Sequence, residues 1–187
     1  ILDLSLDAYD EILSEIDTTN LVERKGIIYI WTNKNLKSRK MEIKIRNDLG
    51  IKQRLLNREE VLKLEPNLSP VFDSGVIYDY AYHARDPKEI TKKLFELFLK
   101  SGGKFKKEEV ESVEQTRYNQ TQVSTNSEKF NFEKIVLACG AFSKKLTDQL
   151  GEKIPLDTER GYHVHYKNMD HLLKRPVIFL DRGFGMT

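Results

Sequence analysis

The sequence predicts a mixed α/β fold (α+β in part), in which helices alternate with short strands and a β-meander is inserted. Three observations lead to this prediction. Apolar β-forming runs such as GIIYIW at 26–31 are short, several segments repeat apolar residues at helical spacing, and three short segments joined by polar turns follow residue 110.

The first half of the chain predicts three helices and two strands. A helix runs from Leu6 to about 18–20, a strand follows at 26–31, and a polar helix covers 35–48 and closes at Gly50. A short helix at 58–64 takes Asn57 as its N-cap and is ended by Pro66. The alternating GVIYDYAY at 75–82 predicts the second strand.

The second half opens with the clearest helical signal. Asp86 caps this helix, Pro87 occupies its first turn, and Gly102-Gly103 ends it. The meander is predicted at 110–116, 121–125 and 129–132, and it leads into a buried strand at 134–138 and a helix at 143–150. Longer strands are predicted at 154–166 and 177–181.

Composition restricts the class of protein. The length of 187 residues suits one ordinary domain or two small ones, and 31 basic against 29 acidic residues give a net charge of +2 without a signature of nucleic-acid binding. No apolar run approaches the roughly 18 residues of a transmembrane segment. The single cysteine, Cys139, excludes an internal disulfide and favours a cytoplasmic, reducing location.

The small residues Ala138, Cys139, Gly140 and Ala141 end the predicted buried strand just before a helix. Such a turn lets a ligand approach the backbone, and its free N–H groups favour an anion or a carbonyl oxygen. The alternative interpretation is that small side chains let the strand pack closely under the helix. These four residues alone favour this alternative. Cys139 is expected to be packed and inert, because its surroundings in sequence are apolar and no histidine is near.

The segment RGYHVHY at 160–166 is a second candidate. Arg160 and Tyr162 would share one face of a strand and could bind a carboxylate together, while a surface ion pair of Arg160 with Asp157 or Glu159 is an equal alternative. His163 and His165 lack a local third ligand, so a metal site is not expected.

Two further signals are weaker. His83, just before the best helix start, could face a cleft, although a solvated loop histidine is the simpler interpretation. The sequence holds no G-x-G-x-x-G, Walker A or G-x-S-x-G motif.

Five segments in order resemble the FAD-dependent D-amino-acid dehydrogenase and glycine oxidase family of D-amino-acid-oxidase-like flavoproteins. They are LNREEVLKLEPNLS (56–69), GVIYDYAYHARDPKEI (75–90), SGGKFKKEEVESV (101–113), KIVLACGAFSKKL (134–146) and IPLDTERGYHVHY (154–166). The resemblance implies a Rossmann-like FAD-binding domain with a β-meander, interleaved with a substrate domain on a mixed or antiparallel sheet.

The resemblance also implies roles for residues. The backbone of Val110 would meet the adenine end of FAD, and 138–141 would pass close to the cofactor, with Phe142 in place of the commoner Trp. Arg160, Tyr162 and His83 become candidate substrate-binding residues. No catalytic acid or base is implied, because hydride passes from the substrate to the flavin.

The implied domain plan divides the chain into four segments. Residues 1–23 and 86–151 would belong to the FAD domain, and 24–85 and 152–187 to the substrate domain. The family's pyrophosphate-binding turn is expected before Ile1 and further flavin-closing parts after Thr187, so this internal fragment alone is expected to be inactive and can lack FAD.

The implied activity of the intact protein is oxidation of the Cα–N bond of an amino acid, most simply a D-amino acid. Alternatives are another amine or 2-hydroxy-acid oxidase of the same superfamily, or a non-catalytic α/β binding module. The electron acceptor, a quinone or oxygen, is not fixed by the sequence, and peripheral membrane association of the intact protein stays open.

Overall fold

The structure is a computed structural model that describes residues 5–33, 36–118, 120–169 and 171–187. It divides into two compact units, which are described separately. The first unit comprises residues 1–103 and 166–187, and the second comprises 104–165. The fold is mixed α/β, as predicted.

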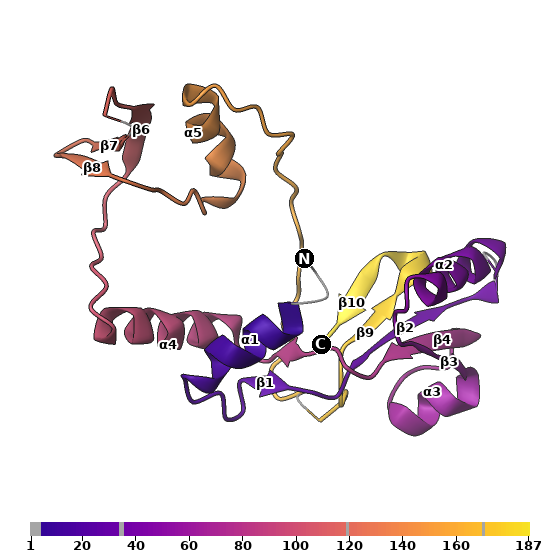
Figure 1. The fold of residues 1–187 in the computed structure, drawn as a ribbon. Coiled ribbons are helices and arrows are strands. Elements are labelled where there is room, and N and C mark those ends of the chain that lie inside the picture. Colours follow the sequence, from indigo (N-terminus) through magenta and orange to yellow (C-terminus); the bar gives the residue numbers. More distant parts are fainter. Residues whose placement is uncertain (1–4, 34–35, 119, 170) are drawn as a thin grey trace. The chain divides into compact units, whose positions relative to one another are not determined.

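The first unit is built on a five-stranded mixed sheet with the strand order β10-β9-β2-β4-β3 (Figure 1). Its strands are β2 (Ile27–Trp31), β3 (Arg54–Asn57), β4 (Ser74–Tyr78), β9 (Val177–Phe179) and β10 (Phe184–Met186). Strand β2 pairs parallel with β9, and the other pairings are antiparallel. The sheet therefore joins strands from both ends of the sequence.

The two faces of this sheet carry separate apolar clusters, because side chains alternate along each strand. Ile28, Ile30 and Ile77 pack on the face covered by helix α3 (Arg58–Leu64). Trp31 and Val76 pack on the opposite face, under helix α2 (Leu36–Asp48). Figure 1 shows α2 and α3 on opposite sides of the sheet.

The predicted cap of the short helix is confirmed. The Asn57 side chain accepts a hydrogen bond from the backbone N–H of Glu60, and the Glu60 carboxylate accepts one from the N–H of Asn57. Two orphan N–H groups at the start of α3 are thereby satisfied.

Helix α4 (Pro87–Lys100) also begins as predicted, with Asp86 accepting from the N–H of Glu89 and Pro87 at the first position. Glycine at 102 has a φ of +89°, which only glycine adopts without strain, so the helix ends there.

Three predicted boundaries in the first unit are wrong. Helix α1 (Ser5–Ser14) ends before residues 18–20. Strand β4 stops at Tyr78, because the N–H of Ala81 donates a hydrogen bond to the Tyr78 carbonyl and closes a turn. After this turn only β5 (His83–Ala84) is extended, and it pairs with β1 (Val22–Glu23). Strand β9 ends at Phe179, where a 3-10 turn (η4, Leu180–Arg182) begins.

The second unit contains the predicted meander as an antiparallel three-stranded sheet. Its strands are β6 (Val110–Gln115), β7 (Thr121–Thr125) and β8 (Lys129–Phe132). Helix α5 (Ser143–Gln149) packs on β6, where Val113 and Leu146 are buried. The helix boundary agrees with the prediction to within one residue.

Two predicted strands are absent from the second unit. Residues 134–138 form no strand, and Val136 is 89% exposed rather than buried. Residues 154–165 are likewise without regular structure, and all of them except the half-buried Ile154 are exposed. A strand is stable only when a neighbour accepts its backbone hydrogen bonds, and neither segment has a paired strand among the described residues.

No helix within the described residues combines the length and apolar character that crossing a membrane requires. The assignment of 1–23, 24–85, 86–151 and 152–187 to two functional domains remains a prediction at this point.

Candidate functional site

The turn at 138–141 lies in the second unit, directly before α5. Residues Gly140–Phe142 form a 3-10 turn (η3), and the backbone N–H of Cys139 donates to Ser143 Oγ at 3.1 Å. Gly140 has a φ of +56°, and a Cβ built on it would meet no heavy atom within 4 Å. The turn therefore needs glycine for its backbone conformation, and the space above it is open.

The side chains around this turn are more exposed than the sequence suggests. Ala138, Cys139 and Gly140 are exposed, and Ala141 is half-buried. The expectation of a packed Cys139 is wrong, because the segment before it is not covered by a second layer. An exposed turn of small residues leaves its backbone accessible to a ligand.

Val110, the other predicted cofactor residue, opens strand β6 in the same unit. The register between β6 and β7 shifts between Val110 and Ser112, which marks a β-bulge at the start of the strand. Val110 itself is half-buried. The predicted cofactor residues thus belong to one compact unit.

Gln149 ties α5 to the meander, a contact that sequence reasoning missed. Its amide oxygen accepts from the N–H of Val113 at 2.9 Å, and its amide nitrogen donates to the carbonyl of Glu111 at 3.2 Å. These bonds satisfy backbone groups on the free edge of β6 and fix the helix that follows the turn. A glutamine late in a polar helix gives no sequence signal for this role.

A second polar cluster holds the turn between β7 and β8. The Glu108 carboxylate accepts from the hydroxyls of Thr125 and Ser127, at 2.5 and 2.8 Å. These hydrogen bonds, with Lys106 nearby, lower the pKa of Glu108 below its ordinary value. The cluster is exposed and bonded internally, so we assign it to the hairpin.

Arg160 and Tyr162 lie in the irregular, exposed part of the second unit, and Tyr162 is 88% exposed. No ion pair joins Arg160 to Asp157 or Glu159 in the described part of the chain. The surface-pair alternative is therefore not what the structure shows.

The two histidines after Arg160 contact each other. The rings of His163 and His165 touch edge to face, with centroids 4.9 Å apart. No group of three or more potential metal-ligating side chains occurs among the described residues.

His83 belongs to the first unit, whereas Arg160 and Tyr162 belong to the second. It stands opposite Glu23 in the β1–β5 ribbon, and its Nε2 contacts the hydroxyl of Thr187. Its Nδ1 is buried and has no hydrogen-bond partner in the described structure. Burial lowers the pKa of His83 below 6.5, and the Glu23 carboxylate partly opposes that shift.

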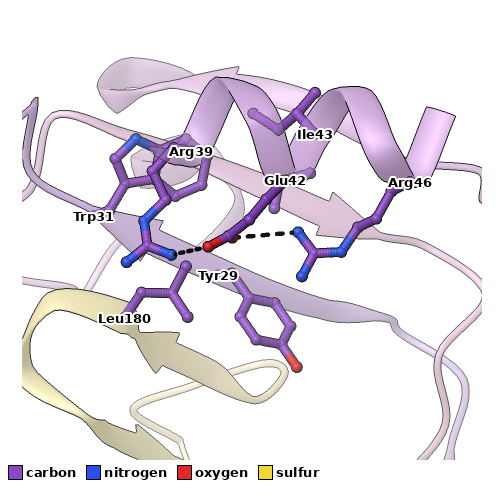
Figure 2. Close-up of a pocket in the computed structure, with 8 residues that line it drawn as sticks. Tyr29, Trp31, Arg39, Glu42, Ile43, Arg46 and Leu180 are labelled. Atoms are coloured by element: carbon purple, nitrogen blue, oxygen red, sulfur yellow. Dashed lines mark hydrogen bonds and ion pairs between the residues drawn. The ribbon is translucent and has the colours of Figure 1, made fainter. Parts of the chain in front are cut away.

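The first unit also has a small hollow between α2 and the sheet (Figure 2). The Glu42 carboxylate ion-pairs with Arg39 at 2.8 Å and with Arg46 at 3.6 Å above the ring of Tyr29. Its volume of about 10 Å³ holds one water molecule at most. The hollow is a packing defect under a helix and is too small for a substrate.

Comparison with known proteins adds a family and several relatives. The model of the DAO family, described as FAD-dependent oxidoreductase, matches residues 1–187. A D-amino-acid oxidase from Bradyrhizobium diazoefficiens is 30% identical over 169 residues, which are 89% of this chain and 40% of that protein.

Solved structures agree on the fold. Glycine oxidase from Geobacillus kaustophilus superposes with a TM-score of 0.71 at 16% identity, over 95% of this chain and 48% of the other. Glycine oxidase from Bacillus cereus superposes with a TM-score of 0.61 at 26% identity, over 76% of this chain and 39% of the other. The chain thus spans half or less of the length of these relatives.

Proposed function

Because the chain belongs to the DAO family of FAD-dependent oxidoreductases, we propose that the intact protein oxidises the Cα–N bond of an amino acid, in the first place a D-amino acid. The observation that carries the proposal is the 30% identity to a D-amino-acid oxidase over 89% of this chain. The two glycine oxidase structures support the same class of substrate.

The turn at 138–141 fits the approach of FAD. The left-handed φ of Gly140, the open space over it and the exposed small side chains beside it would let the cofactor approach the backbone. We propose that this turn and Val110 hold part of FAD, which when bound supplies the two-electron acceptor for the oxidation.

The residues of this chain would then orient the substrate rather than react with it. We propose that Arg160 binds the substrate carboxylate with its planar guanidinium and that the Tyr162 hydroxyl adds a third donor. Both side chains are exposed, so they are free to meet a substrate. Fixing the carboxylate would orient the Cα–H bond, the protein's main share of catalysis in this scheme. His83 is kept as a third substrate-binding candidate.

The four-segment domain plan is part of the proposal. Strands from 24–85 and from 152–187 lie in one sheet, which supports grouping them as a substrate domain. The meander and α5 lie together in the second unit, which supports placing the 104–151 part of the proposed 86–151 segment with the cofactor, whereas 86–103 lies in the first unit. A cytoplasmic location is proposed on the single cysteine alone.

A substrate panel on the full-length protein tests this function. D-amino acids, L-amino acids, glycine, N-methylglycine and 2-hydroxy acids would each be supplied with a redox dye and, separately, with oxygen as the electron acceptor. Preferred turnover of a D-amino acid supports the proposal. Preferred turnover of an N-methylated amine or a 2-hydroxy acid would favour the alternative oxidase, and the two acceptors separate a dehydrogenase from an oxidase.

A further inference from the structure

Gln149 connects the two places at which this chain is proposed to meet FAD. Its side-chain amide accepts from the N–H of Val113 at 2.9 Å and donates to the carbonyl of Glu111 at 3.2 Å. These two residues alternate along β6, so their backbone groups point to the same edge of the strand. The amide therefore bonds to this edge in the pattern of a neighbouring strand, although it is the last residue of a helix.

Helix α5 runs from this amide back to the turn at 138–141. At the start of the helix the buried Ser143 accepts a hydrogen bond from the N–H of Cys139 at 3.1 Å. In the middle Leu146 is buried, and the helix packs on β6 (Figure 1). With 7 residues, α5 is only about 10 Å long. The turn is thus joined to β6 by a short helix that is held at both ends.

Val110, the other proposed cofactor contact, lies at the opposite side of the same connection. It opens β6 and precedes Glu111, which Gln149 binds. The pairing of β6 with β7 shifts between Val110 and Ser112, so the regular ladder does not hold this end of the strand. Gln149 bonds on both sides of Ser112 and fixes the irregular end of β6 from its other edge.

The chain on either side of the turn and α5 is irregular. Residues 134–138 and 154–165 have no regular structure. Isolated helices shorter than about 12–15 residues are marginal in water, so α5 depends on tertiary contacts for its stability. Within the second unit those contacts are with β6. The position of the turn therefore depends on how firmly α5 is attached to that strand.

We propose that Gln149 is a positioning residue for FAD, which sets the distance between Val110 and the turn at 138–141. The inference rests on the proposed function, because it takes these residues as the cofactor contacts. Gln149 acts through β6 and α5 rather than by touching FAD. Its loss lets the turn move relative to Val110, and a cofactor that needs both contacts is then held less tightly.

The competing interpretation is that Gln149 only stabilises the second unit. In that case any substitution that removes a comparable hydrogen bond from the same sheet would affect FAD equally. Gln122 provides this comparison, because its amide nitrogen donates to Asn131 Oδ1 at 3.2 Å, between β7 and β8 rather than at β6.

Titration of the FAD-free full-length protein with FAD, followed by flavin fluorescence, tests the proposal. Gln149→Leu keeps the bulk of the side chain and removes both hydrogen bonds, so it should raise the dissociation constant of FAD about tenfold or more. Gln122→Leu should leave the dissociation constant unchanged. An unchanged value for Gln149→Leu, or an equal rise in the two variants, would overturn the proposal. Urea unfolding checks that every variant is folded.

A double-mutant cycle with Gly140→Ala separates positioning from general stability. Gly140 has a left-handed φ, so alanine there displaces the turn directly. If Gln149 acts through the turn, adding Gln149→Leu to Gly140→Ala should weaken FAD binding further by much less than Gln149→Leu does alone. Losses that multiply would show two independent effects and would overturn the proposal.

The same titration separates this inference from the proposed function. A full-length protein that binds no FAD would contradict the proposed function and the role of Gln149 together. FAD binding that does not respond to Gln149→Leu would contradict only the role of Gln149.

Discussion

Glu65 and Arg175 form an ion pair in the interior of the first unit, at 3.3 Å between Oε1 and Nε, with the Glu65 side chain fully buried. The other carboxylate oxygen accepts from the backbone N–H of Lys174 at 2.8 Å. The pair ties the end of α3 to the segment that leads into β9. The carboxylate thereby joins two segments that are distant in sequence, since Glu65 and Lys174 lie 109 positions apart.

Replacing Arg175 by Met should destabilise the protein by about 3–5 kcal/mol, because it leaves a buried carboxylate without its counter-ion. The double substitution Glu65→Gln with Arg175→Met should recover most of this loss. Urea unfolding measures the free energy of unfolding of both variants. The exposed pair of Arg54 with Asp79, at 3.5 Å, is the control, and Arg54→Met should cost less than about 1 kcal/mol. Equal losses for Arg175→Met and Arg54→Met would contradict the account.

Gly140→Val should abolish retention of FAD by the full-length protein, because the branched side chain would occupy the open space over the turn. Gly151→Val is the matched control. Gly151 also has a positive φ, of +79°, with nothing within 4 Å, so both substitutions carry a similar backbone strain of about 1–2 kcal/mol. The flavin absorbance that stays with each variant after gel filtration measures how much FAD it retains. Flavin loss in both variants, or in neither, would remove the turn from the cofactor site.

His83 predicts a pH dependence of stability. Burial lowers its pKa in the folded protein below 6.5, so the unfolded state binds more protons once the pH falls below about 6.5. Stability should therefore be complete above that pH and decrease as the pH falls further. His83→Gln should reduce this decrease between pH 7.5 and 5, measured by urea unfolding, whereas His165→Gln at an exposed position should not.

The range from pH 7.5 to 5 separates the effect of His83 on stability from that of the neighbouring Glu23. The pKa of Glu23 is lowered by Lys25 through a hydrogen bond and charge. A carboxylate with a lowered pKa loses its stabilisation only as the pH falls below its ordinary value of 4.5. An identical pH profile for His83→Gln and the unchanged protein above pH 5 would show that the His83 ring is not buried as described.

Arg160→Lys should raise KM for the amino acid about tenfold or more with a smaller effect on kcat, because lysine cannot bind a carboxylate through two parallel N–H groups. Steady-state kinetics of the full-length protein measures this change. Lys153→Arg, at another exposed basic position of the same segment, is the control and should leave KM unchanged. Unchanged KM for Arg160→Lys would remove Arg160 from the substrate site.

Local signals in the sequence predicted local structure well. The N-cap at Asn57, the Asp86-Pro87 start of α4 and the three strands of the meander all follow from short-range hydrogen bonding and turn chemistry, and the structure confirms them. The parallel pairing of β2 with β9 and the Glu65–Arg175 pair join distant segments, so no local pattern could reveal them.

The wrong strand predictions also result from contacts between distant segments, which a local pattern does not show. The apolar run at 134–138 and the segment at 154–166 predicted strands, but a strand forms only with a partner, and no described segment supplies one. Cys139 is exposed for the same reason. The polar helix predicted at 35–48, by contrast, is confirmed as α2 (Leu36–Asp48).

The central proposal is that the intact protein is a flavin-dependent oxidase or dehydrogenase of D-amino acids. Anaerobic addition of D-alanine and, separately, of L-alanine to the purified full-length protein tests it most directly, with the visible flavin absorption as the readout. The account predicts a yellow protein whose absorption is bleached by the D-isomer and hardly changed by the L-isomer. A colourless protein, or bleaching by the L-isomer alone, would contradict it.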